Sequence, residues 1–365
     1  MNPIIKVIIV GLGVRGRHWL HVINNHKLAL ITAVVDINHF SKDEIIKKDI
    51  SNIPFFTSLS VALESVESNV VLIVTPPEYH YEQVILAFKR GKHVICEKPL
   101  TEELSKSIIL YKKSLSYNLK LMVGMNFRYL STSQHIRNVV SNSELGPIGY
   151  ANFNYIRNRN GNRKDLNKYP LLMNHPMMLE QSIHHLDLLR YCYMSEVESV
   201  QATTWRPDWS TYDNDCCVSI ILRFHNKFVV NYLGTWTSGW NKFCFQWRTD
   251  FRDGVLIQKD QFSDLYSVIY QKKSSLIGSN FKYSDESEPL NPIALKKDKP
   301  FFDDTNGLLN EFISSIRYNK DLDTGVKDYL KTFVLVIACI QSSDDQSTVY
   351  LEDVYKKYSL QDICE

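Results

Sequence analysis

Apolar and polar positions change their spacing along the chain. In the first third, short unbroken apolar runs rich in branched side chains alternate with stretches whose apolar residues recur at helical spacing. Such runs are typical of strands buried on both faces. We predict strands at residues 4–10, 28–35, 70–74, 93–96 and 120–123, and helices at about 14–25, 79–90 and 102–117. Strand and helix in alternation indicate a parallel, doubly wound sheet, in which ligands gather at the carboxyl ends of the strands.

Beyond residue 147 the pattern is that of strands covered on one face. Aromatic-rich segments of alternating polarity occupy residues 148–157, 197–205, 216–224, 228–236 and 243–248, and His225-Asn226-Lys227 has the length of a hairpin turn. A helix from about Met178 to Cys192 interrupts them, and the stretch from about residue 271 to residue 299 is predicted as a long polar loop. The sequence therefore predicts an α/β protein. Its first domain, at residues 1–125, is doubly wound, and its second, at residues 126–365, is an α/β domain with a large, open, mainly antiparallel sheet.

A glycine-rich turn directly follows the first predicted strand. It is Gly11-Leu12-Gly13-Val14-Arg15-Gly16, it opens a helix, and its last glycine lies 20 residues before Asp36, which ends the second strand. Gly11 allows the tight turn, Gly13 lets the backbone approach a pyrophosphate, and Gly16 lets the helix pack on the sheet. Asp36 can bind the adenosine ribose and would repel a 2′-phosphate. We therefore predict a Rossmann domain that binds NAD, with NADP disfavoured; the alternative is a purely structural glycine turn.

Two further motifs lie at the same predicted edge of the sheet. Thr75-Pro76 follows the strand at 70–74, and Glu97-Lys98-Pro99 follows the strand at 93–96. Lys98 could hold a substrate hydroxyl, and the positive charge of an oxidised nicotinamide would favour its neutral amine. From position alone, a surface lysine in a loop is an equally good interpretation.

The helix predicted in the second domain carries another set of chemical groups. Glu180 and His184 are four residues apart and Asp187 lies three further on, so the three share one helix face. A carboxylate one turn from a histidine can orient the imidazole and stabilise its charged form. His185 lies about 100° around the helix and is the poorer candidate. From the sequence alone, a solvated face or a histidine satisfied in the core is slightly favoured over catalysis.

Charge and composition exclude several classes of protein. The 365 residues are 44% hydrophobic with a net charge of +2, which suits two buried cores and indicates no nucleic-acid or membrane surface. No run approaches the roughly 18 apolar residues of a membrane-spanning helix, and the start does not resemble a signal peptide. The seven scattered cysteines fit reduced thiols in the cytoplasm, with no metal site. A basic loop could grip an acidic sugar or a phosphate, although such runs are more often merely solvated; it holds Arg157, Arg159, Arg163 and Lys164.

Three stretches together resemble the glucose–fructose oxidoreductase/inositol dehydrogenase family, known as Gfo/Idh/MocA. They are the glycine turn at 11–16, Glu97-Lys98-Pro99, and Glu180-Gln181-Ser182-Ile183-His184-His185-Leu186-Asp187. Thr75-Pro76 with His80, Asn126-Phe127-Arg128 and Thr324-Gly325 add to the likeness. The resemblance implies a Rossmann domain followed by an open-sheeted α/β domain, a tightly held NAD(H) or NADP(H), and hydride transfer at a sugar carbon. It also implies final helices that pack near the cofactor domain, and a homodimer or homotetramer formed through the second sheet.

The resemblance also implies roles for single residues. Lys98 matches the family's catalytic lysine and His184 its acid/base histidine, while Glu180 stands where the family usually has aspartate. The predicted catalytic residues are therefore Lys98, His184 and Glu180. The predicted cofactor contacts are Gly11, Gly13, Val14, Arg15, Gly16, Asp36, Thr75, Pro76, His80, Glu97, Lys98 and Asn126. The predicted substrate contacts are Lys98, Arg128, Arg157, Glu180, His184 and Asp187.

Together these features predict a NAD-dependent oxidoreductase that transfers a hydride between the nicotinamide and a hydroxyl-bearing carbon of a sugar, sugar derivative or cyclitol. Lys98 and His184 would flank the reacting hydroxyl, and which of them takes its proton stays open. An enzyme that retains NAD and cleaves or rearranges a glycoside could use the same residues. A non-enzymatic NAD-binding sensor is a third possibility, and the presence of both Lys98 and His184 argues against it.

Overall fold

The structure, a computed structural model, describes residues 4–38, 52–164, 166–269 and 289–364. Most of the predicted polar loop at 271–299 lies outside these ranges. The chain forms two compact units. The first unit comprises residues 1–129, 299–337 and 355–365, and the second comprises residues 130–298 and 338–354.

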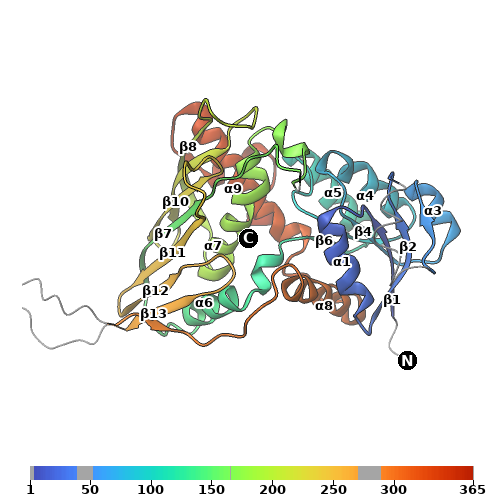
Figure 1. Cartoon of the computed structure of the whole chain (residues 1–365), viewed down its shortest axis with the longest axis horizontal. Coiled ribbons are helices and arrows are strands. Elements are labelled where there is room, and N and C mark those ends of the chain that lie inside the picture. Colours follow the sequence, from blue (N-terminus) through green and yellow to red (C-terminus); the bar gives the residue numbers. More distant parts are fainter. Residues whose placement is uncertain (1–3, 39–51, 165, 270–288, 365) are drawn as a thin grey trace, which may run out of the picture. The chain divides into compact units, whose positions relative to one another are not determined.

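The sheet of the first unit is parallel and doubly wound (Figure 1). Its six strands lie in the order β3-β2-β1-β4-β5-β6, and every pair is parallel. Their bounds are β1 Ile5–Val10, β2 Ala29–Val35, β3 Phe55–Phe56, β4 Val70–Ile73, β5 His93–Cys96 and β6 Leu121–Val123. The strand order reverses at β1, which is where sheets of this type bind a dinucleotide. The predicted alternation of strand and helix is confirmed here.

Helices from both ends of the sequence belong to this unit. From the N-terminal part come α1 (Val14–Asn24), α3 (Leu59–Ser65), α4 (His80–Lys89) and α5 (Leu104–Tyr117). From the C-terminal part come α8 (Asp303–Tyr318), the first half of α9 (Val326–Asp345), the end of α10 (Leu351–Lys357) and α11 (Gln361–Cys364). Buried side chains of α8, including Leu308 and Phe312, share one apolar cluster with Trp19 and Ile23 of α1.

The second unit contains a nine-stranded sheet in the order β14-β13-β12-β11-β7-β10-β9-β8-β15. All described pairs are antiparallel except β7 with β10, so the predicted mainly antiparallel sheet is confirmed. The strand bounds are β7 Ile148–Ile156, β8 Val197–Trp205, β9 Cys217–Phe224, β10 Val229–Thr235, β11 Cys244–Phe251, β12 Gly254–Gln258, β13 Leu265–Ile269, β14 Asn291–Pro292 and β15 Val349–Tyr350. The hairpin predicted at 225–227 joins β9 to β10.

One face of this sheet is covered by helix. In β9 and β11, buried residues alternate with exposed ones, as expected when a single face is packed. Two helices of this unit are α6 (Ser131–Ser141) and α7 (Ile183–Tyr193), and a π-helical turn over Met177–Ser182 precedes α7. His185 of α7 packs against the rings of Phe153 and Tyr155 on β7, at centroid distances of 4.6 and 4.9 Å. Helix α7 therefore lies on the inner face of the sheet.

The described residues were also compared with the features of membrane-spanning and metal-binding proteins. None of the helices in the described part of the chain is both long and apolar enough to cross a membrane. Within the same ranges, no group of three or more histidine, cysteine, aspartate or glutamate side chains is arranged to hold a metal ion.

Candidate active site

The glycine turn is shaped by two close backbone approaches. Gly11 has a φ of +98°, its N–H donates to the Val35 carbonyl oxygen at 2.8 Å, and a Cβ placed on it would lie 2.7 Å from the Val74 carbonyl oxygen. A Cβ on Gly16 would lie 2.1 Å from the Gly11 carbonyl oxygen. Side chains are therefore excluded at both positions.

The middle of the same turn is exposed to solvent. Gly13 is exposed, and a Cβ there would meet nothing within 4 Å among the described residues. No side chain caps the N-terminus of α1, and Val14 in its first turn is 50% exposed. Uncapped N–H groups at a helix N-terminus form an anion site. These residues therefore fit the pyrophosphate of a dinucleotide.

Asp36 lies beside this turn at the end of β2. Its Oδ2 accepts a hydrogen bond from the Leu12 N–H at 2.7 Å, and its Oδ1 accepts one from the Asn38 N–H at 2.8 Å. The carboxylate is half-buried and held at the edge of the glycine turn. That is where an acid must lie to meet the adenosine ribose.

Arg15 links the glycine turn to the motif around Lys98. Its Nε donates to Glu97 Oε1 at 2.7 Å, and its Nη1 donates to Thr305 Oγ1 at 2.7 Å. Trp19 Nε1 donates to the same Glu97 oxygen at 2.7 Å. Burial raises the pKa of Glu97, but the Arg15 charge and these hydrogen bonds outweigh it, and the net pKa is lowered. Glu97 is thus a buried carboxylate that anchors the turn.

His80 joins two turns at the carboxyl edge of the sheet. It is fully buried, with Nε2 2.8 Å from the Thr75 carbonyl oxygen and Nδ1 2.9 Å from the Pro99 carbonyl oxygen. Burial lowers the pKa of the imidazole, although the two carbonyl groups act in the opposite direction. The Thr75-Pro76 turn is therefore tied to the Glu97-Lys98-Pro99 turn through one side chain.

Lys98 itself follows β5 and is half-buried. The residues around it are fixed: Glu97 by Arg15 and Trp19, Pro99 by His80, and the Leu100 N–H by the Tyr329 hydroxyl at 3.0 Å. These contacts hold the backbone on both sides of the lysine. Lys98 therefore lies in a turn whose neighbouring residues are fixed by hydrogen bonds.

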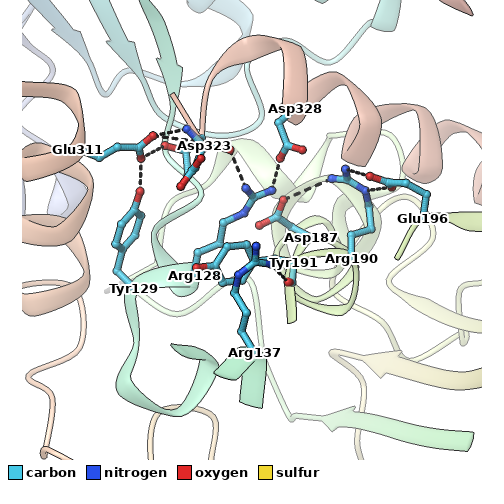
Figure 2. A network of polar contacts seen from close by, with 11 residues as sticks. Arg128, Tyr129, Arg137, Asp187, Arg190, Tyr191, Glu196, Glu311, Asp323 and Asp328 are labelled. Carbon is cyan, nitrogen blue, oxygen red and sulfur yellow. Dashed lines mark hydrogen bonds and ion pairs between the residues drawn. The ribbon is translucent and has the colours of Figure 1, made fainter. Parts of the chain in front are cut away.

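Asn126 and Arg128 lie in a short turn after β6 and contact C-terminal helices of the same unit. Asn126 donates to Asp304, whose pKa burial raises to about 6. The guanidinium of Arg128 donates to the Asp323 carbonyl oxygen at 2.7 Å and pairs with the Asp328 carboxylate (Figure 2). Arg128 is only 4% exposed, so much of its hydrogen-bonding capacity is used within the first unit.

The helix of the second unit that carries Glu180 and His184 is not regular. Its first turn, Met177–Ser182, is π-helical, and α7 follows from Ile183. The predicted helix at about 178–192 is therefore present, but the i→i+5 bonding of its first turn changes the angular offset between Glu180 and His184 that α-helical spacing implies. Turns of this kind occur often at functional sites. Glu180 is half-buried and His184 is 6% exposed.

Asp187 faces an arginine of its own helix. Its Oδ1 lies 3.9 Å from Arg190 Nη1, and Arg190 in turn forms two hydrogen bonds with Glu196, at 2.6 and 2.7 Å (Figure 2). Asp187 and Arg190 are both buried. Asp187 therefore lies beside a buried cation of its own helix.

A directed chain of hydrogen bonds lies beneath the π-helical turn. The Tyr155 hydroxyl donates to Gln181 Oε1 at 3.2 Å, and Gln181 Nε2 lies 3.0 Å from His185 Nε2. An amide NH2 can only donate, so His185 Nε2 accepts and its Nδ1–H donates to the Tyr232 hydroxyl at 2.9 Å. Tyr232 then donates to Ser182 Oγ at 2.8 Å. Burial lowers the pKa of His185 to about 3, so this histidine stays neutral and structural.

The comparison with known proteins follows the same division of the chain. Residues 5–125 match the Gfo/Idh/MocA description "Oxidoreductase family, NAD-binding Rossmann fold", and residues 133–252 match "GFO/IDH/MocA C-terminal domain". The chain belongs to the Gfo/Idh/MocA family. The resemblance inferred from the motifs is thereby confirmed, as is a NAD-binding Rossmann domain in an oxidoreductase family.

Several relatives within the family act on sugars or cyclitols. The chain is 27% identical over 210 residues to glucose-6-phosphate 3-dehydrogenase of Bacillus subtilis, covering 54% of this chain and 57% of that enzyme. It is 23% identical over 198 residues to inositol 2-dehydrogenase of Rhodococcus jostii, covering 54% and 52%. It is also 29% identical over 140 residues to 2,7-anhydro-N-acetylneuraminate hydratase of Escherichia coli, covering 38% and 37%. Each match spans little more than half of the relative's length or less.

A solved structure shows the same fold over almost the whole chain. An oxidoreductase from Agrobacterium radiobacter, in complex with NAD+, L-tartaric acid and magnesium, has a TM-score of 0.81 at 17% identity and covers 96% of this chain and 99% of its own. At this identity the likeness establishes the fold alone.

Several residues of this Gfo/Idh/MocA chain that hold the candidate site in place were not predicted from the sequence. In the first unit they are Trp19, Thr305 and Tyr329, and in the second Tyr155, Gln181 and Tyr232. Only Gln181 could have been found, because it lies within the motif at 180–187. The others act through contacts with partners remote in sequence, which spacing does not reveal.

Tyr232 provides a test of the hydrogen-bond chain. Tyr232→Phe removes the donor to Ser182 and the acceptor for His185 Nδ1–H, and leaves both buried. We expect a loss of about 1–3 kcal/mol in the free energy of unfolding, measured by urea denaturation. Tyr318→Phe, at a 65% exposed position, should change it by less than about 0.5 kcal/mol. Equal stability of the two variants would contradict the assigned network.

Proposed function

We propose that the protein is a NAD-dependent dehydrogenase that transfers a hydride to or from a hydroxyl-bearing carbon of a sugar, sugar derivative or cyclitol. The observation that carries the proposal is the turn around Lys98. Within one parallel sheet, that turn and the glycine turn lie at the same carboxyl edge, and Arg15 with Glu97 joins them. A half-buried lysine in a rigid turn beside a dinucleotide site suits alcohol oxidation.

The chemistry divides among a few groups. NAD, when bound, supplies the hydride acceptor. The Lys98 side chain would bind the substrate hydroxyl. As a neutral amine it would accept the hydroxyl proton, and as an ammonium group it would stabilise the alkoxide that remains when His184 takes that proton. His184 would exchange that proton as acid or base. Glu180 would orient the imidazole or stabilise its protonated form. Asp187 and Arg128 stay predicted substrate contacts.

Cofactor binding would fall to two groups of residues. The direct contacts would be Gly11, Gly13, Val14, Gly16, Asp36, Thr75, Pro76 and Lys98. Residues Arg15, His80, Glu97 and Asn126 would act by holding these groups and Lys98 in place, since each is already bonded within the first unit. The Asp36 carboxylate favours NAD over NADP, because it would repel a 2′-phosphate and the neighbouring Ile37 and Asn38 offer no cation.

The location and the oligomeric state of the protein can also be proposed. We propose that it is cytoplasmic and forms a homodimer or homotetramer. The outer face of the nine-stranded sheet carries exposed apolar side chains, including Tyr150, Trp205 and Ile221, that a second copy could cover.

A substrate screen tests the proposed function. The protein is incubated with NAD or NADP and a panel of cyclitols, aldoses, uronates and nucleotide sugars, and NADH is followed by absorbance. We expect turnover of at least one polyol with NAD preferred. Retained NAD binding without turnover of any member would reject a dehydrogenase.

One relative favours a second candidate. The similarity to a hydratase suggests that the same residues could serve a reaction that consumes no net NAD. Conversion of an anhydro-sugar or glycoside, detected by chromatography without net NADH, would support that reaction over the dehydrogenase.

A further inference from the structure

Two arginines extend the buried face of β7 beyond the end of the strand. In β7 the buried residues are Ala151, Phe153 and Tyr155, which alternate with more exposed neighbours. The extended backbone continues, because the Arg157 N–H donates to Thr235 at 3.0 Å and the Arg159 N–H donates to Trp236 at 2.9 Å. Side chains two residues apart in such a segment lie on one face. Arg157 and Arg159 therefore follow Tyr155 on the side covered by α7.

Neither arginine has an acidic partner among the residues that the structure describes. Arg157 Nη1 lies 3.4 Å from the Tyr155 hydroxyl, which is a weak hydrogen bond to a neutral group. Arg159 donates to the Tyr212 hydroxyl, and its guanidinium lies 4.3 Å from the Trp236 ring centroid. Both side chains are half-buried. A guanidinium has five N–H donors, so Arg157 retains a fork free for a planar anion.

Arg157 is also close to the helix that carries the proposed acid/base groups. Its contact Tyr155 donates to Gln181, the residue next to Glu180 in the π-helical turn. Arg157 thus lies two hydrogen bonds from that turn. The arrangement is contained in the second unit and is held by backbone hydrogen bonds on both sides of Arg157, including the Ser238 N–H to the Arg157 carbonyl oxygen at 3.2 Å.

We propose that Arg157, with Arg159 beside it, binds a carboxylate or phosphate group of the substrate, so that the protein prefers acidic sugars to neutral polyols. The inference rests on the proposed function in one respect: it takes the helix bearing Glu180 and His184 as the part that meets the substrate. Bidentate bonding to a guanidinium supplies both affinity and orientation, since it fixes the sugar relative to that helix.

Matched sugars test this preference. D-Glucose, D-glucuronate and D-glucose 6-phosphate, and the same three forms of D-galactose, are compared on the NAD-loaded protein. Turnover is followed by NADH absorbance and binding by calorimetry. In at least one set, we expect the acidic sugars to bind more tightly and to turn over faster than the neutral sugar. Comparison of the uronate with the sugar phosphate shows whether a carboxylate or a phosphate is preferred.

Variants then assign the preference to Arg157. In Arg157→Gln we expect the advantage of the acidic members to fall by about 30- to 100-fold, and in Arg157→Lys by less, because a point charge remains. Arg223→Gln makes the same substitution at an exposed position on the opposite face of the sheet, on β9, and should leave the ratio unchanged. Arg157→Lys also covers the case in which Arg157→Gln does not fold.

Three outcomes would overturn the inference: preference for the neutral members, an unchanged ratio in Arg157→Gln, or no binding of any acidic member. Failure of the proposed function is distinguishable from these. If acidic sugars bind through Arg157 but form no NADH, the anion site is supported and the proposed dehydrogenase activity is rejected. If only neutral polyols are oxidised, the dehydrogenase activity is supported and the anion site is rejected.

Discussion

Replacing Lys98 with methionine is expected to lower turnover by about 10²- to 10⁴-fold while leaving the fold intact. The neighbouring contacts explain why the turn should keep its structure. Glu97, Pro99 and Leu100 are held by Arg15, His80 and Tyr329, and none of these bonds uses the Lys98 side chain. Methionine has a similar reach but no charge and no exchangeable proton.

The measurement is kcat for the best substrate of the screen, with NAD affinity and melting temperature determined in parallel. Lys112→Met is the matched control, because Lys112 is exposed on α5 in the same unit. Wild-type turnover in Lys98→Met would remove Lys98 from the mechanism. A parallel loss of NAD binding would instead indicate that the lysine serves the cofactor site.

Replacing Gly16 with alanine is expected to abolish measurable NAD binding or to destabilise the first unit severely. The added Cβ would lie 2.1 Å from the Gly11 carbonyl oxygen, and a backbone atom cannot yield as the end of a flexible side chain can. Gly11 is itself fixed by its hydrogen bond to Val35 and by its approach to Val74. Relief of the clash must therefore move α1 away from the sheet, at a cost of about 1–3 kcal/mol or more.

Two other glycines make the test specific. A Cβ on Gly13 meets nothing within 4 Å, so Gly13→Ala should fold normally and still lose NAD affinity, because the methyl group fills the path of the pyrophosphate. Gly239→Ala, in a loop of the second unit with open space around it, should alter neither property. Melting temperature and NAD affinity are measured for all three. Gly16→Ala with wild-type values of both would refute this account of the turn.

The sequence was most informative where one residue type has one physical reason to be present. Short runs of branched apolar residues that alternate with segments of helical spacing predicted the parallel strands, because strands buried on both faces are rich in such residues. The glycine turn was recognisable because its three glycines answer three separate steric demands, two of which the structure displays directly at Gly11 and Gly16. The role of Lys98 depended on family resemblance, because a lysine after a strand has no unique explanation.

Contacts between distant residues could not be predicted in the same way. The guanidinium of Arg15, a predicted cofactor contact, is bonded to Glu97 and Thr305. These residues are 82 and 290 positions away in the sequence, so spacing could not reveal the two bonds. The π-helical turn was hidden because its composition suits an α-helix equally well. The parallel pairing of β7 with β10 was also hidden, because the two strands are far apart in the sequence. Sequence patterns reveal mainly the antiparallel pairs that short turns join.

The contribution of α8 to the first unit affects how the chain can fold during synthesis. Leu308, Leu309, Phe312 and Ile313 complete the apolar cluster around Trp19. These residues leave the ribosome after the entire nine-stranded sheet apart from β15 has been made. Until then the nascent Rossmann segment carries an uncovered apolar surface, and it is open to aggregation and to capture by chaperones. A chain that ends at residue 129 would therefore be an unfinished domain, even though it contains every strand of the parallel sheet.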